Sequence, residues 1–254
     1  GGYYRGSMIL VSGSAGTGKS TLAAAFVAAA CARGERALLF AYEESASQIV
    51  RNMSSVGIDI GRWVKKGLLQ IHASRPTLNG LEQHLVMMHD SVKEFDPKVV
   101  VIDPISNLTM EHDEAVKPTL MRLINNLKVE DITALFTSLT SDKGVFREDS
   151  EVGVSSLMDT WIALRTVETD AERSKALVIL KARGISHSQH VVGFNLSRKG
   201  IQLHPVGPLL AGDGAMPTAA GVKREWGVPA PAGRKKGKEE RAVKTKTRRK
   251  AKHG

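Results

Sequence analysis

The stretch GSAGTGKS, residues 13–20, has the residue types and spacing of a loop that wraps phosphate groups. Its glycines allow the backbone to curl so that peptide N–H groups face the phosphates. Lys19 is expected to reach the β- and γ-phosphates of ATP, and the Ser20 hydroxyl to bind Mg²⁺. The predicted nucleotide-binding residues of this loop are Gly13, Ser14, Ala15, Gly16, Thr17, Gly18, Lys19, Ser20 and Thr21.

A carboxylate that could complete the Mg²⁺ site ends the apolar run KVVVID, residues 98–103. Asp103 lies where a neighbouring hydrophobic strand of a phosphate-loop protein supplies its metal-side acid. An aspartate at a strand end also serves as a helix cap, so the assignment depends on the presence of the phosphate loop. Pro104, and no glutamate, follows Asp103, so we expect the catalytic base to come from elsewhere.

Two adjacent glutamates, Glu43 and Glu44, leave the run FAYEES and are the candidates for that base. A carboxylate there could lie beside the γ-phosphate and orient or deprotonate a nucleophile. Glu44 could instead begin the next helix, where an acidic residue is favoured. Ser138 and Thr140, at the end of ITALFTSLT, could sense the γ-phosphate through their hydroxyls or could be ordinary polar residues at a strand end.

Between residues 1 and 205, short β-rich runs alternate with helical patterns, which predicts an α/β fold with a mainly parallel sheet flanked by helices. The phosphate loop falls between the first strand and the first helix, as its chemistry requires. The expected strands of this part are 7–13, 36–44, 68–73, 98–103 and 132–139, and the expected helices are 19–34, 45–57, 80–95 and 114–127. Three further strands separated by short turns predict an antiparallel extension over 160–168, 175–183 and 190–197.

The net charge of +10 is concentrated at one end of the chain. Thirteen of the 36 Lys and Arg residues but only three of the 26 acids lie in residues 223–254, so 23 residues of each sign remain in the rest. The segment 206–254 is rich in Pro, Gly and Lys and has no apolar periodicity, which predicts a disordered tail. Such a tail could be a solubilising extension, or it could make an electrostatic contact with nucleic acid or an acidic partner.

Several features limit the class and compartment of the protein. The longest apolar run, residues 22–32, is shorter than the about 20 residues that a membrane-spanning helix needs. There is no signal-peptide pattern, and the single cysteine, Cys31, lies within the first predicted helix, where we expect a buried and unreactive thiol. These features predict a soluble cytoplasmic protein. The chain opens without Met, which suggests that it is part of a longer protein.

The order of six motifs, GSAGTGKS, AYEES, VVVID, LFTSLTSD, VSSLMDT and LKARG, resembles the C-terminal ATPase domain of the KaiC family, which belongs to the RecA-like phosphate-loop ATPases. The resemblance covers roughly residues 1–200. It implies a homo-oligomeric ring of six subunits with ATP bound between them. It also implies that Glu43 and Glu44 assist both hydrolysis and phosphate transfer.

Further roles follow from the same resemblance. It implies that Ser155 and Ser156 are phosphorylated by the γ-phosphate held on the adjacent subunit. It also implies that Lys181 and Arg183, in the segment KARG, reach the nucleotide of a neighbour. Without the resemblance, alternating basic residues would suggest a solvated strand edge.

The chain departs from the family pattern in three places. The family has a Ser-Thr pair where this chain has two serines, which keeps both hydroxyls. Residues 104–114, PISNLTMEHDE, are acidic where the family has a basic residue for the neighbouring site. The Lys-rich tail does not match the family's tail, so the resemblance does not carry over binding of the family's activating partner, and regulatory protein partners stay possible.

Two alternatives of other classes stay open at this stage. A RecA- or RadA-like DNA-dependent ATPase motor would use the basic tail to grip DNA, but the balanced charge of the remaining residues argues against a DNA channel. A nucleotide-gated scaffold with little turnover is the other alternative.

Overall fold

The computed structural model describes residues 2–74, 81–108, 116–140, 155–168, 173–198 and 200–205. All of them belong to one compact unit, Gly1–Met216. The predicted tail, residues 206–254, lies outside the described residues.

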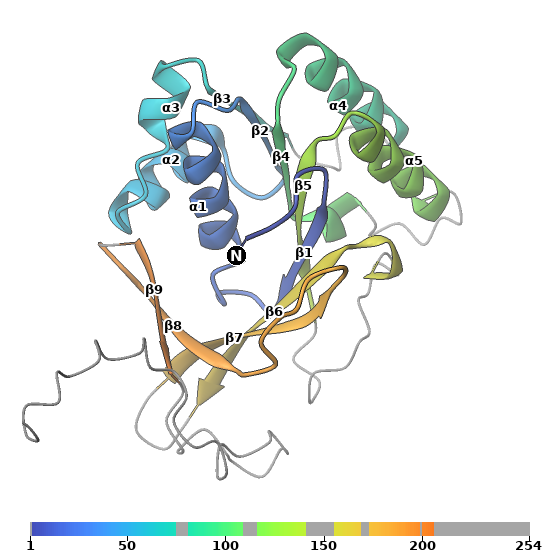
Figure 1. Cartoon of the computed structure of the whole chain (residues 1–254). Coiled ribbons are helices and arrows are strands. Elements are labelled where there is room, and N and C mark those ends of the chain that lie inside the picture. The colour runs from blue at the N-terminus through green and yellow to red at the C-terminus, as the bar shows by residue number, and fades with distance from the viewer. Residues whose placement is uncertain are drawn as a thin grey trace, which may run out of the picture. The chain divides into compact units, whose positions relative to one another are not determined.

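A single twisted sheet organises the described residues, with helices on both of its faces (Figure 1). Its strand order is β3-β2-β4-β5-β1-β6-β7-β8-β9. The strands are β1 (Met8–Gly13), β2 (Ala37–Ala41), β3 (Leu69–Ala73), β4 (Val99–Asp103), β5 (Thr133–Leu139), β6 (Thr160–Glu168), β7 (Arg173–Ala182), β8 (Val192–Ser197) and β9 (Gly200–Pro205). The predicted α/β class with a RecA-like arrangement is confirmed.

The pairing changes direction at β6. Strands β1 to β6 pair in parallel, whereas β6-β7, β7-β8 and β8-β9 are antiparallel. The antiparallel extension is therefore confirmed, but its first strand, β6, also pairs in parallel with β1. The short strand β9 was missing from the sequence prediction.

Helices α1, α2 and α3 lie on one face of the sheet, and α4 and α5 lie on the other (Figure 1). They are α1 (Lys19–Ala32), α2 (Ala46–Ser55), α3 (Gly61–Lys65), α4 (Leu81–Phe95) and α5 (Val116–Val129), with short 3-10 turns η2 (Ile105–Leu108) and η3 (Ser155–Leu157). Each face has its own apolar cluster because side chains alternate along the buried strands. Within the described part of the chain, no helix is long and apolar enough to cross a membrane.

Helix α1 is built to pack closely against the sheet. Small alanines fill its sequence, KSTLAAAFVAAACA, and Ala23, Ala24 and Ala30 are buried. The helix ends at Ala32, and Gly34, two residues further on, has a φ of 82°, the left-handed conformation that closes a Schellman motif: the N–H groups of Gly34 and Glu35 donate to carbonyls of the last turn. The predicted helix 19–34 is therefore present, but its helical residues end two positions earlier and Gly34 forms the turn after it.

Candidate active site

The phosphate loop joins β1 to α1, and its course depends on three glycines. Gly16 and Gly18 have φ angles of 76° and 104°, a region that favours glycine. At Gly13, a Cβ atom would lie 2.6 Å from the carbonyl oxygen of Leu164 on β6, too close for any side chain. The sequence therefore permits a backbone course that other residues would obstruct.

The remaining loop residues shape the N-terminal end of α1. The Thr17 hydroxyl is buried and donates to the carbonyl oxygen of Ser14 at 2.9 Å, which closes the loop on itself. Ala15 is exposed at the loop crown, Ser20 is half-buried and Thr21 is buried in the first helical turn. The positive end of the helix and its unpaired N–H groups favour a bound phosphate here.

Lys19 is held inside the loop. Its Nζ donates to the carbonyl oxygens of Gly13 and Ser14, at 2.8 Å each, and the residue is 7% exposed. Burial lowers the pKa of Lys19, while the carboxylates of Asp103 and Glu43 oppose that shift. The ammonium group is thus positioned beside both candidate acids, where it can neutralise phosphate charge.

Asp103 ends β4 next to this lysine and is oriented by a neighbour on β5. The Thr137 hydroxyl, fully buried, donates to Oδ1 of Asp103. This hydrogen bond restricts rotation of the Asp103 side chain and so sets the direction of its second carboxylate oxygen. Ser20 and Asp103 would supply the hydroxyl and the carboxylate of an Mg²⁺ site, and Mg²⁺ at phosphates takes one or two such protein oxygens. The residues present therefore fit Mg²⁺ and ATP.

The hydroxyl nearest the metal-side acid is Thr137, which sequence reasoning missed. Ser138 is buried on the opposite face of the sheet from α1, because consecutive strand residues alternate, and its hydroxyl donates to the Leu139 carbonyl at 3.3 Å. The Thr140 backbone N–H donates to the carbonyl oxygen of Gly13 at 3.2 Å. Thr140 therefore borders the loop, whereas Ser138 does not face it.

The two glutamates diverge after β2. Glu43 is exposed and close enough to Lys19 to act on its pKa. Glu44 is half-buried, and its Oε2 accepts a hydrogen bond of 2.7 Å from Asn52 of α2. Helix α2 itself is capped by a Ser45–Gln48 capping box, so Glu44 lies outside the helix and does not cap it. Glu43 therefore acts on Lys19, whereas Glu44 is held to α2.

The serine pair lies at the other end of the sheet from the phosphate loop. Turn η3 leads into β6, and the Asp159 backbone N–H between them donates to the Met8 carbonyl at 2.8 Å. Met8 begins β1, whereas the loop follows the last residue of the same strand. At about 3.3 Å per residue, the two ends of β1 are about 16 Å apart.

Lys181 and Arg183 lie with the serines. Lys181 pairs with Trp161 at the start of β6, and the Arg183 guanidinium donates to the Ser156 carbonyl at 2.7 Å. We define the serine edge as Ser155, Ser156, Lys181 and Arg183. We define the loop edge as residues 13–20 with Glu43, Asp103 and Thr137. The structure brings the members of each edge together and keeps the two edges apart.

One basic residue reaches the loop from the antiparallel strands. Lys175, near the start of β7, donates from Nζ to the carbonyl oxygen of Gly16 at 2.9 Å. Because β7 runs antiparallel to β6, its first residues approach the loop edge while its last residues, including Lys181, approach the serine edge. Sequence reasoning missed Lys175 because its position depends on this strand direction.

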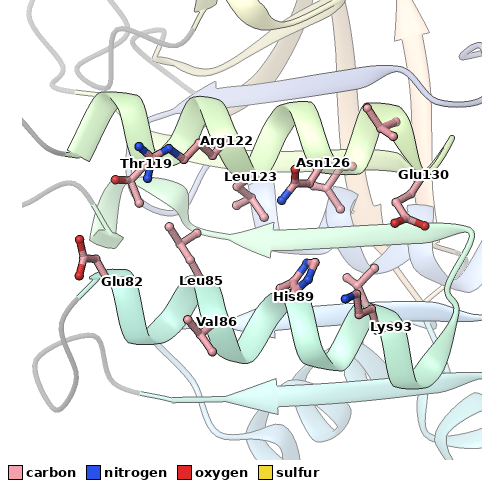
Figure 2. Close-up of a pocket in the computed structure, with 13 residues that line it drawn as sticks. Glu82, Leu85, Val86, His89, Lys93, Thr119, Arg122, Leu123, Asn126 and Glu130 are labelled. Atoms are coloured by element: carbon pink, nitrogen blue, oxygen red, sulfur yellow. The ribbon is translucent and has the colours of Figure 1, made fainter.

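A separate groove of about 520 Å³ lies between α4 and α5 (Figure 2). Leu85, Val86 and Leu123 are among its apolar lining residues, and Lys93 and Glu130 lie at one end. It contains none of the predicted site residues. Helix α1 and the phosphate loop cover the opposite face of the sheet.

Some predicted features lie outside the described residues. They are residues 109–114 of the acidic segment, the side chain of Ser155 and the tail 206–254. The side chain of Ser156 is described, and it is exposed.

Comparisons with known proteins identify relatives of this chain. A family model described as "ATPase: KaiC" matches residues 1–207. The circadian clock protein KaiC2 of Synechocystis sp. is 50% identical over 204 residues, covering 80% of this chain and 36% of that protein. The circadian clock oscillator protein KaiC of Picosynechococcus sp. is 38% identical over 201 residues, covering 79% of this chain and 39% of that protein.

This chain therefore spans less than two fifths of the length of those two relatives. The family match covers the loop edge, the serine edge and every strand of the sheet, so it concerns the whole described unit. The resemblance inferred from the six motifs is confirmed, and the chain belongs to the KaiC family of ATPases, with a domain that binds ATP.

Proposed function

We propose that the chain is an Mg²⁺-dependent ATPase and serine autokinase that phosphorylates Ser155 or Ser156 of an adjacent subunit in a homo-oligomeric ring. The observation that carries the proposal is the separation of the loop edge from the serine edge by the length of β1. A phosphate held by the loop of one subunit is too far from the serines of that same subunit for direct transfer.

A second copy of the chain removes this difficulty. Contact between the loop edge of one subunit and the serine edge of the next joins two different surfaces. Such a heterologous interface closes into a ring when its rotation allows. Lys181 and Arg183 would arrive at the neighbour's nucleotide together with the serines, since all four belong to the same edge. The family resemblance implies six subunits.

The transfer itself needs a base, charge neutralisation and in-line placement. The serine hydroxyl oxygen attacks the γ-phosphorus while the bond to the bridging oxygen breaks, and ADP leaves with that oxygen. The serine proton passes to the carboxylate of Glu43, and water deprotonated in the same way would give hydrolysis. Mg²⁺, bound by Ser20 and Asp103, would stabilise the charge on the phosphates, as would Lys19 and the neighbour's Arg183.

Complementation between two inactive variants tests the proposal. Glu43→Gln/Glu44→Gln keeps the serines, and Ser155→Ala/Ser156→Ala keeps the base and the loop. Each variant is incubated alone with Mg·ATP, then both are mixed and allowed to exchange subunits, followed by mapping of phosphopeptides. We expect label on the peptide 148–165 of the glutamate variant only in the mixture. Wild-type label without label in the mixture would show transfer within one subunit and overturn the proposal.

The same assay distinguishes the alternative classes. ATP turnover stimulated by DNA, with no label on the serine peptide, would support a DNA-dependent motor. ATP binding with neither turnover nor label would support a nucleotide-gated scaffold. Because two relatives are named as circadian clock proteins, we infer that the phosphorylation state of this chain serves timing or signalling through a regulatory protein partner.

A further inference from the structure

Three basic side chains and one carboxylate surround the serine turn η3. Lys128 comes from the last turn of α5, Lys181 from the end of β7, and Arg183 directly follows β7. Asp159 lies between η3 and β6. We call these four residues the cation cluster.

The contacts within the cation cluster involve the backbone of the turn. Lys128 Nζ donates to the Leu157 carbonyl at 3.4 Å and lies 3.3 Å from the Asp159 carboxylate. Arg183 donates to the Ser156 carbonyl at 2.7 Å and lies 3.9 Å from Asp159 Oδ1. Both cations therefore contact the turn and the same carboxylate.

The cation cluster is open to a ligand from solvent. Side-chain exposure is 34% for Lys128, 54% for Arg183 and 24% for Asp159. Burial lowers the pKa of Lys181, and the neighbouring charges of Arg183 and Lys128 lower it further against the opposing effect of Asp159. Arg183, Lys128 and Asp159 therefore all lie close enough to Lys181 to act on its charge.

We propose that the cation cluster is the binding site for a phosphoryl group carried by Ser156 of the same subunit, in which the phosphate displaces Asp159 from Arg183 and Lys128. This proposal rests on the proposed function in one respect, since the autokinase would be the source of the phosphate on Ser156. A phosphoserine carries about −1.5 to −2 charges at neutral pH, more than the single charge of the Asp159 carboxylate that Lys128 and Arg183 contact. Phosphate oxygens can also form paired hydrogen bonds with the planar guanidinium of Arg183. The Asp159 carboxylate, at 3.9 Å, makes only a long contact with it.

Ser156 lies close enough to Arg183 for a phosphate on this serine to contact the guanidinium. The Arg183 guanidinium is already at hydrogen-bonding distance from the carbonyl oxygen of Ser156, and the Ser156 side chain is exposed. Rotation of these two side chains is enough to bring a phosphate on that serine to the guanidinium. No movement of a strand is needed.

Asp159 tolerates the displacement because it has another partner. Its Oδ2 accepts a hydrogen bond of 2.9 Å from the Met8 backbone N–H, which joins β6 to β1 independently of the cations. The Asp159 carboxylate therefore keeps its hydrogen bond from Met8 when the phosphate replaces it as the partner of Arg183. An Arg183 bound to the phosphate of its own subunit cannot simultaneously reach the nucleotide of a neighbour, so phosphorylation would withdraw a trans contact.

The test uses the full chain with phosphoserine inserted at position 156 during translation. The pKa of the phosphate is followed by ³¹P NMR across pH 4–8. We expect a value about one unit below the about 6 of a free phosphoserine, since nearby cations favour the dianion. Lys128→Met and Arg183→Gln should each reverse a large part of this shift, and Arg183→Lys should retain most of it.

A matched control is available on the other helix of the same layer. Lys93 lies in the last turn of α4, as Lys128 lies in the last turn of α5, and Lys93→Met should leave the phosphate pKa unchanged. A phosphate pKa equal to that of a phosphopeptide with the sequence SSLMDT would overturn the proposal, as would a shift insensitive to both Lys128→Met and Arg183→Gln. Circular dichroism verifies that each variant is folded.

The result is independent of the kinase proposal, because the phosphate is introduced by translation and not by ATP. Failure of the complementation assay with a shifted phosphate pKa would reject only the autokinase. Label on the serines with an unshifted pKa would reject only the cation cluster as a phosphate site.

Discussion

The two edges of the central sheet are built from different kinds of interaction. At the loop edge, glycine conformations and buried hydrogen bonds set the positions of Lys19 and Asp103. At the serine edge, Lys128 and Arg183 donate to carbonyls of the turn η3 and form partly exposed ion pairs with Asp159. Buried hydrogen bonds fix geometry, whereas exposed ion pairs exchange partners at little cost. The difference suggests a rigid edge for nucleotide binding and an adjustable edge for changes in charge.

The largest effect is expected at Lys19. Lys19→Met removes the ammonium group within the loop, and we expect ATP to bind at least about 100-fold more weakly, since hydrogen bonds to charged groups are strong. Equilibrium binding of a fluorescent ATP analogue measures this loss. The free energy of unfolding should change by only about 1 kcal/mol, because the lost hydrogen bonds and the relieved burial of a charge oppose each other.

An unfolding change far above that value would mean that Lys19 holds the loop together even without nucleotide. Lys93→Met, which removes an exposed lysine at the end of α4, is the control and should affect neither quantity. The two variants together separate the function of the buried ammonium group from a general effect of losing positive charge.

The next effect is expected at Thr137, and it tests the rigidity of the loop edge. Thr137→Val keeps the shape of the side chain but removes the hydroxyl that orients Asp103. We expect Mg·ATP to bind about tenfold more weakly, because a misdirected carboxylate is a poorer metal ligand. Binding of ATP in the presence of EDTA should be nearly unchanged. Titrations with and without Mg²⁺ measure both values.

Ser138→Ala is the matched control on the same strand. Its hydroxyl lies on the other face of the sheet, so this variant should bind Mg·ATP as the wild type does. Equal losses in the two variants would contradict a specific role for Thr137 and would indicate a general disturbance of β5.

The choice between these hydroxyls illustrates the limits of sequence reasoning at the site. The phosphate loop and Asp103 could be predicted because a loop motif and a strand end are local features. Thr137 could not be separated from Ser138, since their faces depend on which side of the sheet receives α1. Lys175 was missed for a related reason, because its approach to Gly16 requires the direction of β7.

The fold shows the same division between local and long-range information. Hydrophobic runs and helical periodicity located eight strands and four helices. Helix α3 has five residues, too few for a periodic pattern, and β9 follows β8 after a very short turn that the pattern did not mark. The parallel pairing of β6 with β1 joins residues about 150 positions apart, which no local pattern determines.

The smallest effect compares two lysines of the same strand, β7, one at each edge. Lys175→Met removes a donor to the loop carbonyl of Gly16 and a positive charge near the phosphates, so we expect about a three- to tenfold loss of ATP affinity in dilute, dissociated subunits. Lys181→Met should leave that affinity unchanged, since Lys181 lies at the serine edge of its own subunit.

At concentrations where the subunits assemble, Lys181→Met should lower ATP turnover, and Lys175→Met should still bind ATP more weakly than the wild type. Binding measured across a concentration series provides both comparisons. An equal loss of affinity for the two variants in dissociated subunits would contradict the separation of the edges, because it would require Lys181 to act on the nucleotide of its own chain across the length of β1.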